Sequence, residues 1–80
     1  MKALLQFLVE SIAQNPKEVK IKENTTGDLV ELTIQAHPDD LKIIIGKGGR
    51  TIKAIREVVR IKALMAGKKM KLNIEENLKK

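Results

Sequence analysis

Hydrophobic residues recur at helical spacing in three stretches of the chain. The first stretch starts at the N-terminus and ends before Asn15-Pro16, because the residue that precedes a proline is disfavoured in the α region. The second opens at residues 37–40, where a proline and two carboxylates mark a helix start, and stops at Gly46. The third runs from about Arg50 to Ala66, and Gly67 follows it in the position typical of a C-terminal cap. The pattern therefore predicts three helices, of which the middle one is short.

Three further stretches alternate between hydrophobic and polar residues, which is the period of a half-buried strand. They are Lys17–Glu23, Leu29–Ala36 and Lys69–Ile74. The first two flank a turn cluster at residues 24–28, so we expect them to form a hairpin. When the hydrophobic side of each strand faces the helices, four lysines lie on the solvent side: Lys20, Lys22, Lys69 and Lys71.

The predicted elements follow one another in the order α-β-β-α-α-β. We expect an α+β fold of two layers, in which all three helices cover one face of a three-stranded sheet. The length of 80 residues favours a single domain. We place this domain at residues 1–75 and interpret residues 76–80 as a flexible C-terminal tail.

Charge is unevenly distributed along the chain, whose formal net charge is +6. Residues 1–41 hold four basic and seven acidic side chains, whereas residues 42–80 hold twelve basic and three acidic ones. This asymmetry is typical of a protein with one surface that attracts an anionic polymer. The alternative is that the excess of lysines serves solubility alone.

Several absences narrow the class of protein, although the lack of cysteine is neutral about its compartment. The chain contains no cysteine, which excludes disulfides, thiolate metal sites and cysteine nucleophiles. The N-terminal hydrophobic run is broken by Gln6 and Glu10, so it does not fit a signal peptide. No stretch approaches the roughly 20 hydrophobic residues needed to cross a bilayer. We expect a cytoplasmic protein without membrane insertion.

No constellation of residues suggests an enzyme. The glycines fit neither a Walker A loop nor a dinucleotide-binding motif, and Ser11, the only serine, has no base near it. Asp39 and Asp40 stand at a predicted helix start, where they complement the helix dipole. His37, the only histidine, fits a loop or capping role better than that of a ligand. We expect no catalytic residue, cofactor, metal or small-molecule substrate.

Gly46-Lys47-Gly48-Gly49 separates the second and third predicted helices. Two helices that meet over so few residues need a tight turn, and glycine tolerates the backbone angles and the close approach that this turn requires. On a loop so poor in side chains, a sugar–phosphate backbone would lie directly against the main chain and the positive end of the next helix. Five cations surround the loop with no acidic residue among them: Lys42, Lys47, Arg50, Lys53 and Arg56.

The third predicted helix has three distinct sides. Its core side carries Ile52, Ile55, Val59 and Ala63. A basic side continues from the glycine loop and carries Arg50, Lys53, Arg56 and Arg60. A second hydrophobic set is turned away from the core and consists of Ala54, Val58, Ile61 and Met65. Either the first helix covers this set, or the set is an interface for a second copy or another protein.

The glycine loop, with the apolar pair Ile44-Ile45 before it and Ile52 after it, resembles the loop of KH domains. The element order resembles the type II, bacterial form of that domain, and the chain as a whole resembles the short stand-alone KH proteins of the KhpA family. This resemblance implies that residues 46–49 clamp the backbone of about four unpaired nucleotides of RNA. It also implies that an apolar groove, which includes Ile45 and Ile52, receives their bases.

The aromatic content agrees with a KH domain. Phe7 is the only aromatic residue, whereas RNA-recognition motifs and OB-folds usually stack bases on aromatic side chains. The same shortage predicts modest affinity and a loose sequence preference. Single-stranded DNA would also fit, because nothing in the sequence identifies a contact to the 2′-hydroxyl.

The resemblance further implies partners and a cellular role. It points to homodimers, to heteromers with a larger KH protein (KhpB-like), and to RNA chaperoning or post-transcriptional regulation in bacterial cell division, cell shape and cell wall organisation. Two alternatives stay open. In the first, the protein is primarily an interaction module, and its RNA binding is secondary or needs a partner. In the second, it binds structured RNA by charge alone and does not use the glycine loop.

Overall fold

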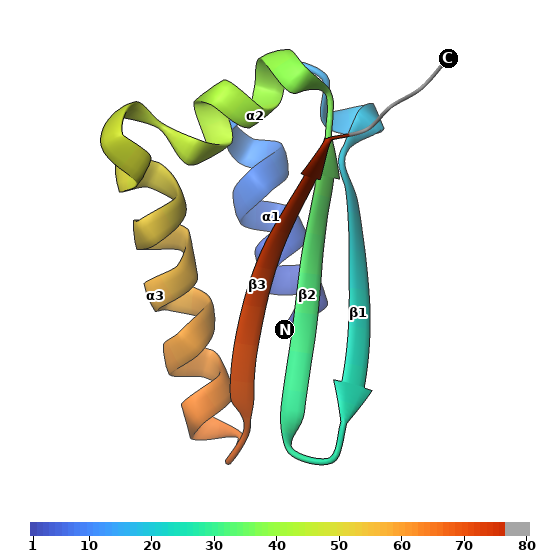
Figure 1. Ribbon diagram of the computed structural model, residues 1–80, viewed down its shortest axis with the longest axis vertical. Coiled ribbons are helices and arrows are strands. Elements are labelled where there is room, and N and C mark those ends of the chain that lie inside the picture. The colour runs from blue at the N-terminus through green and yellow to red at the C-terminus, as the bar shows by residue number, and fades with distance from the viewer. Residues whose placement is uncertain (77–80) are drawn as a thin grey trace.

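A computed structural model describes residues 1–76 of the chain. The order α-β-β-α-α-β is confirmed (Figure 1), with one 3₁₀ turn before the first strand and another between the last two helices. The elements are α1 (Lys2–Ile12), a 3₁₀ turn (Pro16–Glu18), β1 (Lys20–Thr26), β2 (Leu29–Ala36), α2 (Pro38–Ile45), a 3₁₀ turn (Lys47–Gly49), α3 (Arg50–Met65) and β3 (Lys69–Glu76).

The three strands form one mixed sheet in the order β1-β2-β3. β1 and β2 are antiparallel, with Ile21 opposite Ile34, and β3 joins β2 in parallel, with Leu72 opposite Leu32. A parallel pair needs a crossover connection, which α2 and α3 supply here. Figure 1 shows α1 behind the sheet, α2 across its upper end and α3 beside β3. The predicted α+β fold with two layers is therefore confirmed.

The core lies between the helices and the inner face of the sheet. Alternate residues of β2 are fully buried there, and α1 contributes Leu5 and Val9 from one of its sides. Ile44 of α2 and Ile52 of α3 join the same core from the two sides of the glycine loop. Burial of such a side chain contributes about 1.5–3 kcal/mol, so both ends of the loop are held by hydrophobic packing.

The first hairpin differs from the prediction in its boundaries. The strand predicted from Lys17 begins only at Lys20, because residues 16–18 form a 3₁₀ turn in which Glu18 and Val19 donate backbone hydrogen bonds to the carbonyls of Asn15 and Pro16. β1 then continues through residues 24–26, which had been assigned to the turn. These residues are exposed and polar, and their pairing with β2 is carried by the backbone. The actual turn is Gly27-Asp28, where the φ of 61° at Gly27 permits a two-residue connection.

The ends of α3 and β3 complete the domain. Gly67 adopts the left-handed φ of 70° expected of a C-terminal cap, and Lys68 donates to the carbonyl of Ala63 at 2.8 Å. β3 runs to Glu76, one residue into the predicted tail, and Glu75 accepts a hydrogen bond from Gln35 at 2.8 Å. The rest of the predicted flexible tail, residues 77–80, lies outside the described residues.

The outer face of the sheet is polar. Lys20, Lys22, Lys69 and Lys71 are exposed, as predicted. Glu31 lies among them, 4.0 Å from the Lys71 ammonium, and accepts a hydrogen bond from Asn73 at 2.8 Å. None of the helices within residues 1–76 has the length and hydrophobicity to cross a membrane.

Candidate nucleic-acid interface

α2 begins with a histidine cap. The Nδ1 atom of His37 accepts the backbone N–H of Asp39 at 3.1 Å, which is the capping role expected of this histidine, and Pro38 takes the first helical position. Asp39 is exposed in the first turn, where it complements the helix dipole. Within residues 1–76, no three His, Asp or Glu side chains gather in a way that would hold a metal ion.

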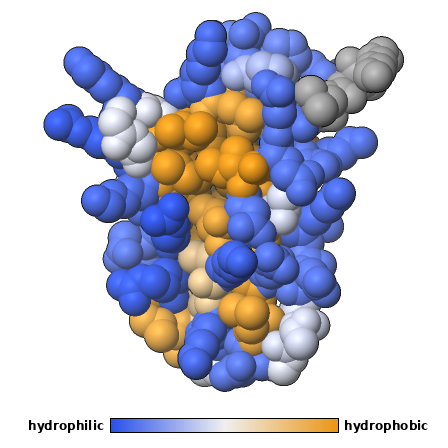
Figure 2. All heavy atoms as spheres, in the orientation of Figure 1, coloured by the Kyte–Doolittle hydropathy of each residue, from blue (hydrophilic) through white to orange (hydrophobic). Residues whose placement is uncertain are grey.

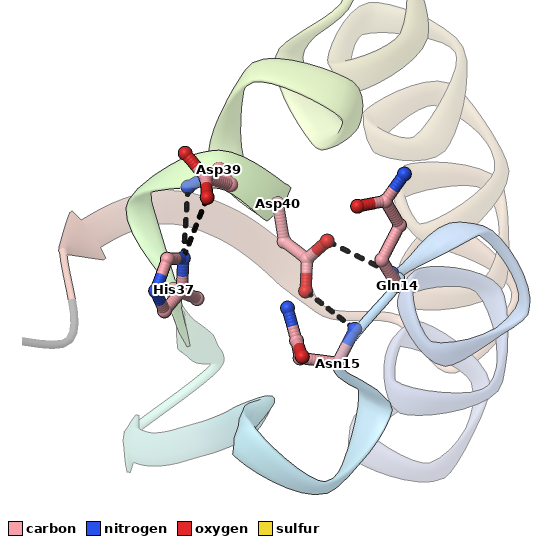
Figure 3. Close-up of polar contacts among 5 residues, drawn as sticks. All are labelled: Gln14, Asn15, His37, Asp39 and Asp40. Carbon is pink, nitrogen blue, oxygen red and sulfur yellow. Dashed lines mark hydrogen bonds and ion pairs between the residues drawn. The ribbon is translucent and has the colours of Figure 1, made fainter.

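Asp40 has a role that the sequence did not reveal. Its carboxylate is fully buried and accepts the backbone N–H groups of Gln14 at 2.8 Å and Asn15 at 2.9 Å (Figure 3). Burial raises the pKa of Asp40, but these hydrogen bonds outweigh it, and the net pKa lies below the ordinary value. The side chain therefore ties α2 to the segment that follows α1. A sequence does not distinguish this buried carboxylate from an exposed one at a helix start.

Gly46 sets the angle between α2 and α3. Its φ of 76° and ψ of 171° belong to a region that other residues rarely adopt. A Cβ atom at this position would collide with Oγ1 of Thr51 and would lie 2.8 Å from its Cβ and 3.0 Å from its backbone nitrogen. The end of one helix therefore touches the first turn of the next, and this contact requires glycine.

The rest of the loop is open to solvent. Residues 47–49 form one 3₁₀ turn, closed by a hydrogen bond of 3.1 Å from the N–H of Gly49 to the carbonyl of Gly46. Gly48 and Gly49 have φ of 65° and 77°, and a Cβ atom on either would meet nothing within 4 Å. The outer surface at these two residues is bare main chain, which a polymer backbone can approach closely.

The first turn of α3 faces this open surface with its N–H groups. No side chain caps the helix, and no acidic residue lies in the first turn. Uncapped N–H groups and the positive end of the helix dipole both favour an anion. The loop and the start of α3 thus attract negative charge at the same place.

Exposed cations surround the loop. Within residues 1–76, no carboxylate forms an ion pair with any of the five predicted cations: Lys42, Lys47, Arg50, Lys53 and Arg56. Arg60, farther along the basic side of α3, differs from them. It bonds Glu57 through two contacts of 3.0 and 3.2 Å, and this hydrogen bond lowers the pKa of the Glu57 carboxyl. On the basic side of α3, the cations without an ion pair in residues 1–76 therefore lie toward the loop end.

Hydrophobic side chains lie beside the loop. Ile45 is 37% exposed, whereas Ile52, which was also predicted to contact RNA, is only 7% exposed and packs in the core. Figure 2 shows an apolar area between α2, α3 and β3. Partly buried hydrophobic side chains of these elements are Leu41, Ile43, Met70, Leu72 and Ile74. The hydrophobic side of β3 is predicted to face the core, and its residues are only partly buried because β3 lies at the edge of the sheet.

The family of the chain follows from a comparison with known proteins. The family model described as KhpA/KhpB, KH domain, matches residues 2–74, which include the glycine loop and nearly all of the three strands. The chain belongs to the KhpA/KhpB KH-domain family.

Curated relatives of this KH domain match it over almost their full length. The RNA-binding protein KhpA of Halalkalibacterium halodurans is 34% identical over 92% of this chain and 97% of its own. The RNA-binding protein KhpA of Chlamydia caviae is 43% identical over 96% of this chain and 99% of its own. The predicted resemblance to KhpA-family KH domains is confirmed.

A crystal structure of Era, in complex with MgGDPNP and nucleotides 1506–1542 of 16S ribosomal RNA, resembles this KH domain. The TM-score is 0.65 with 22% identity, over 94% of this chain and 29% of the Era chain. At this identity the likeness concerns the fold alone. It agrees with the type II KH topology.

Proposed function

We propose that this KH domain binds single-stranded RNA, with residues 46–49 against the sugar–phosphate backbone and Ile45 beside the bases. The observation that carries the proposal is the bare glycine surface between an uncapped helix start and five cations that form no ion pair within residues 1–76. Relatives that match over their full length bear the name RNA-binding protein, which supports RNA as the ligand. The function is binding rather than catalysis, in the cytoplasm, as an RNA chaperone or post-transcriptional regulator.

The chemistry of the groove limits its selectivity. Its partly exposed side chains are aliphatic, so bases would be held by hydrophobic contact without aromatic stacking. One loop engages few phosphates, and we expect modest affinity with little sequence preference. The affinity for single-stranded DNA should be compared with that for RNA, because no residue is identified that would contact the 2′-hydroxyl of RNA.

The test is a titration of labelled single-stranded RNA with the wild type and the variant Lys47→Asp/Gly48→Asp. The substitutions place two carboxylates where phosphates should lie, at exposed positions outside the core. A control variant, Lys22→Asp/Asn24→Asp, makes the same change in net charge on the outer face of β1. We expect the loop variant to lose binding and the control to retain most of it, with circular dichroism confirming that both are folded.

Salt and competitor define the mode of binding. For roughly two to four neutralised phosphates on a single strand, the log–log salt slope should be about −1.4 to −2.8. Duplex RNA should compete poorly. The proposal fails if the loop variant binds as tightly as the wild type, or if duplex RNA competes as well as single strands. RNA would then be bound by charge alone, and the glycine loop would only connect α2 to α3.

A second candidate function is favoured by the outer side of α3. Val58, Ile61 and Met65 are 45%, 52% and 81% exposed, and Ala54 is exposed beside them, so α1 does not cover this set. We propose that it is an interface for a second copy of the chain or a larger KH protein of the KhpB type. The mass in solution of the wild type and of Val58→Glu/Ile61→Glu tests this. A wild type that stays monomeric at high concentration would exclude self-association.

A further inference from the structure

The side chain of Thr51 lies directly beside the glycine loop. Because α3 begins at Arg50, Thr51 is the second residue of the helix. On the side of Gly46 where a Cβ atom would stand, the nearest atom is the hydroxyl oxygen of Thr51, followed by its Cβ and its backbone nitrogen. The methyl carbon of Thr51 lies farther away than these three atoms. The side chain is therefore oriented with its hydroxyl group toward the loop.

This hydroxyl group has no hydrogen-bond partner within residues 1–76. Ser11 in α1 shows the usual arrangement inside a helix, since its hydroxyl donates to the carbonyl of Phe7, four positions earlier, at 2.6 Å. The carbonyl four positions before Thr51 belongs to Lys47 in the 3₁₀ turn, and it already accepts the backbone N–H of Arg50. The hydroxyl of Thr51 is thus left available to a ligand.

A ligand can also reach this hydroxyl group. Thr51 is partly buried, and no buried side-chain oxygen or nitrogen within residues 1–76 lacks a hydrogen-bond partner. Since the Thr51 hydroxyl has no such partner, its oxygen must keep accessible surface. A β-branched side chain has few accessible χ1 rotamers, so the hydroxyl is held in place at little further cost in entropy when a ligand binds.

The surroundings of the hydroxyl favour an anion as its ligand. The start of α3 has no side-chain cap and no acidic residue in its first turn. Lys47 and Arg50 are exposed on either side of the two open glycines and form no ion pair within residues 1–76. Phosphate oxygens accept hydrogen bonds from threonine hydroxyls as well as from backbone N–H groups and helix starts. All three kinds of donor meet at this loop.

We propose that the Thr51 hydroxyl donates a hydrogen bond to a phosphate oxygen of the strand that the glycine loop holds. This inference rests on the proposed RNA binding and adds to it a neutral, directional donor. The cations attract the strand over several ångströms, whereas a hydroxyl on the first turn of α3 fixes where one phosphate lies along the loop. A contact to phosphate carries no sequence information, so it contributes to affinity whatever the bases are.

Three substitutions of Thr51 separate its hydroxyl from its shape. Thr51→Val removes the hydroxyl and keeps the branched side chain, Thr51→Ala removes it without placing a methyl group against Gly46, and Thr51→Ser keeps it. Labelled single-stranded RNA is titrated with each folded variant, and urea denaturation measures their stability. We expect Val and Ala at this position to weaken binding about tenfold, at the lower end for a hydrogen bond to a charged group, and Ser to stay within about threefold of the wild type. The matched control is Thr33→Val, at a partly buried threonine on the outer face of β2, which should leave binding unchanged.

The salt dependence distinguishes a donor from a residue that only holds the loop in place. A hydroxyl releases no counterion, so Thr51→Val should keep the log–log salt slope of the wild type while its affinity falls. Arg50→Gln should weaken binding and also reduce the slope by about 0.7. A displaced loop would lose phosphate contacts as well, so a reduced slope in Thr51→Val would overturn the donor role. An equal loss of affinity in Thr51→Ser would overturn it too, because it would assign the effect to the methyl group.

Two comparisons identify the ligand atom and separate this inference from the proposed function. Single-stranded DNA of the same sequence carries the same phosphates, so Thr51→Val should weaken its binding by the same factor as for RNA. A loss confined to RNA would overturn phosphate as the acceptor. If Thr51→Val and Thr51→Ala bind like the wild type while Lys47→Asp/Gly48→Asp does not bind, Thr51 makes no contact and the glycine loop remains the site. If all of these variants bind like the wild type, the proposed function itself fails.

Discussion

Replacing Asp40 with asparagine changes one buried charged group while keeping its shape. The carboxylate accepts two backbone N–H groups, from Gln14 and Asn15, at 2.8 and 2.9 Å. The amide of asparagine accepts only one of them and turns its own N–H₂ group toward the other. Each hydrogen bond to a charged group contributes about 1.5–3 kcal/mol, and a buried donor left unpaired costs about 1–3 kcal/mol. We therefore expect a loss of about 2–4 kcal/mol in the free energy of unfolding.

That loss is large for a domain of this size. At about 0.05–0.15 kcal/mol per residue, the total stability is about 4–12 kcal/mol. A small domain loses about 4–8 °C of melting temperature per kcal/mol, so Asp40→Asn should melt about 8–32 °C below the wild type. Thermal and urea denaturation followed by circular dichroism measure both quantities. Asp39→Asn is the matched control, because its carboxylate is exposed and makes no buried bond, and we expect it to change stability by less than about 1 kcal/mol.

The dependence on pH distinguishes the charge from the shape of Asp40. Burial raises its pKa, the hydrogen bonds outweigh burial, and the folded-state pKa lies below the unfolded value. The contribution is therefore complete above the unfolded pKa of about 3.9 and is lost as the pH falls through the folded pKa. The difference between wild type and Asp40→Asn should shrink below about pH 4. A difference below 1 kcal/mol at neutral pH, or one that is unchanged in acid, would refute this account of Asp40.

Three further changes test the loop and its surroundings. Gly46→Ala should lower the urea midpoint more than Gly27→Ala, because both positions have positive φ but only the first would place a Cβ against Thr51. Ile45→Ala should weaken RNA binding several-fold with less than about 1 kcal/mol of lost stability, since this side chain is partly exposed. Arg56→Gln should weaken RNA binding and reduce the salt slope by about 0.7, whereas Arg60→Gln should change both less, because Glu57 already compensates its charge.

The element order could be predicted because the sequence marks its helix ends with residues of fixed effect. Gly67 stands just beyond the end of α3 and Gly46 stands between two helices, whereas α1 ends at Ile12, four positions before Pro16. The boundaries of β1 were wrong for a physical reason. Backbone pairing with β2 holds the polar residues 24–26 in the strand. Because their side chains are not hydrophobic, the sequence shows no alternating pattern there that would predict a strand.

The candidate site was predictable only where it is local. The glycine loop and its cations are adjacent in the sequence, and helical periodicity places the outer side of α3 correctly. The two hydrogen-bond partners of Asp40 lie 26 and 25 positions away, and the burial of Ile52 depends on the packing of α3 against the sheet. Likewise, Leu72 lies beside Leu32 only through the parallel pairing of β3, which a single sequence does not encode locally.

The parallel pairing of β3 with β2 also affects how the domain assembles and opens. The β1–β2 hairpin closes through near neighbours, a process of about 1–10 μs, whereas Leu72 must find Leu32, which lies 40 positions earlier in the chain. The connection between them contains the whole loop and both of its helices, so β3 docks late and, as an edge strand, is well placed to detach first. This strand borders the apolar area that Figure 2 shows beside α2 and α3. We therefore expect the amide protons of β3 to exchange faster than those of β2 in the free protein. RNA bound beside this strand should slow that exchange, because binding would stabilise β3 against local opening.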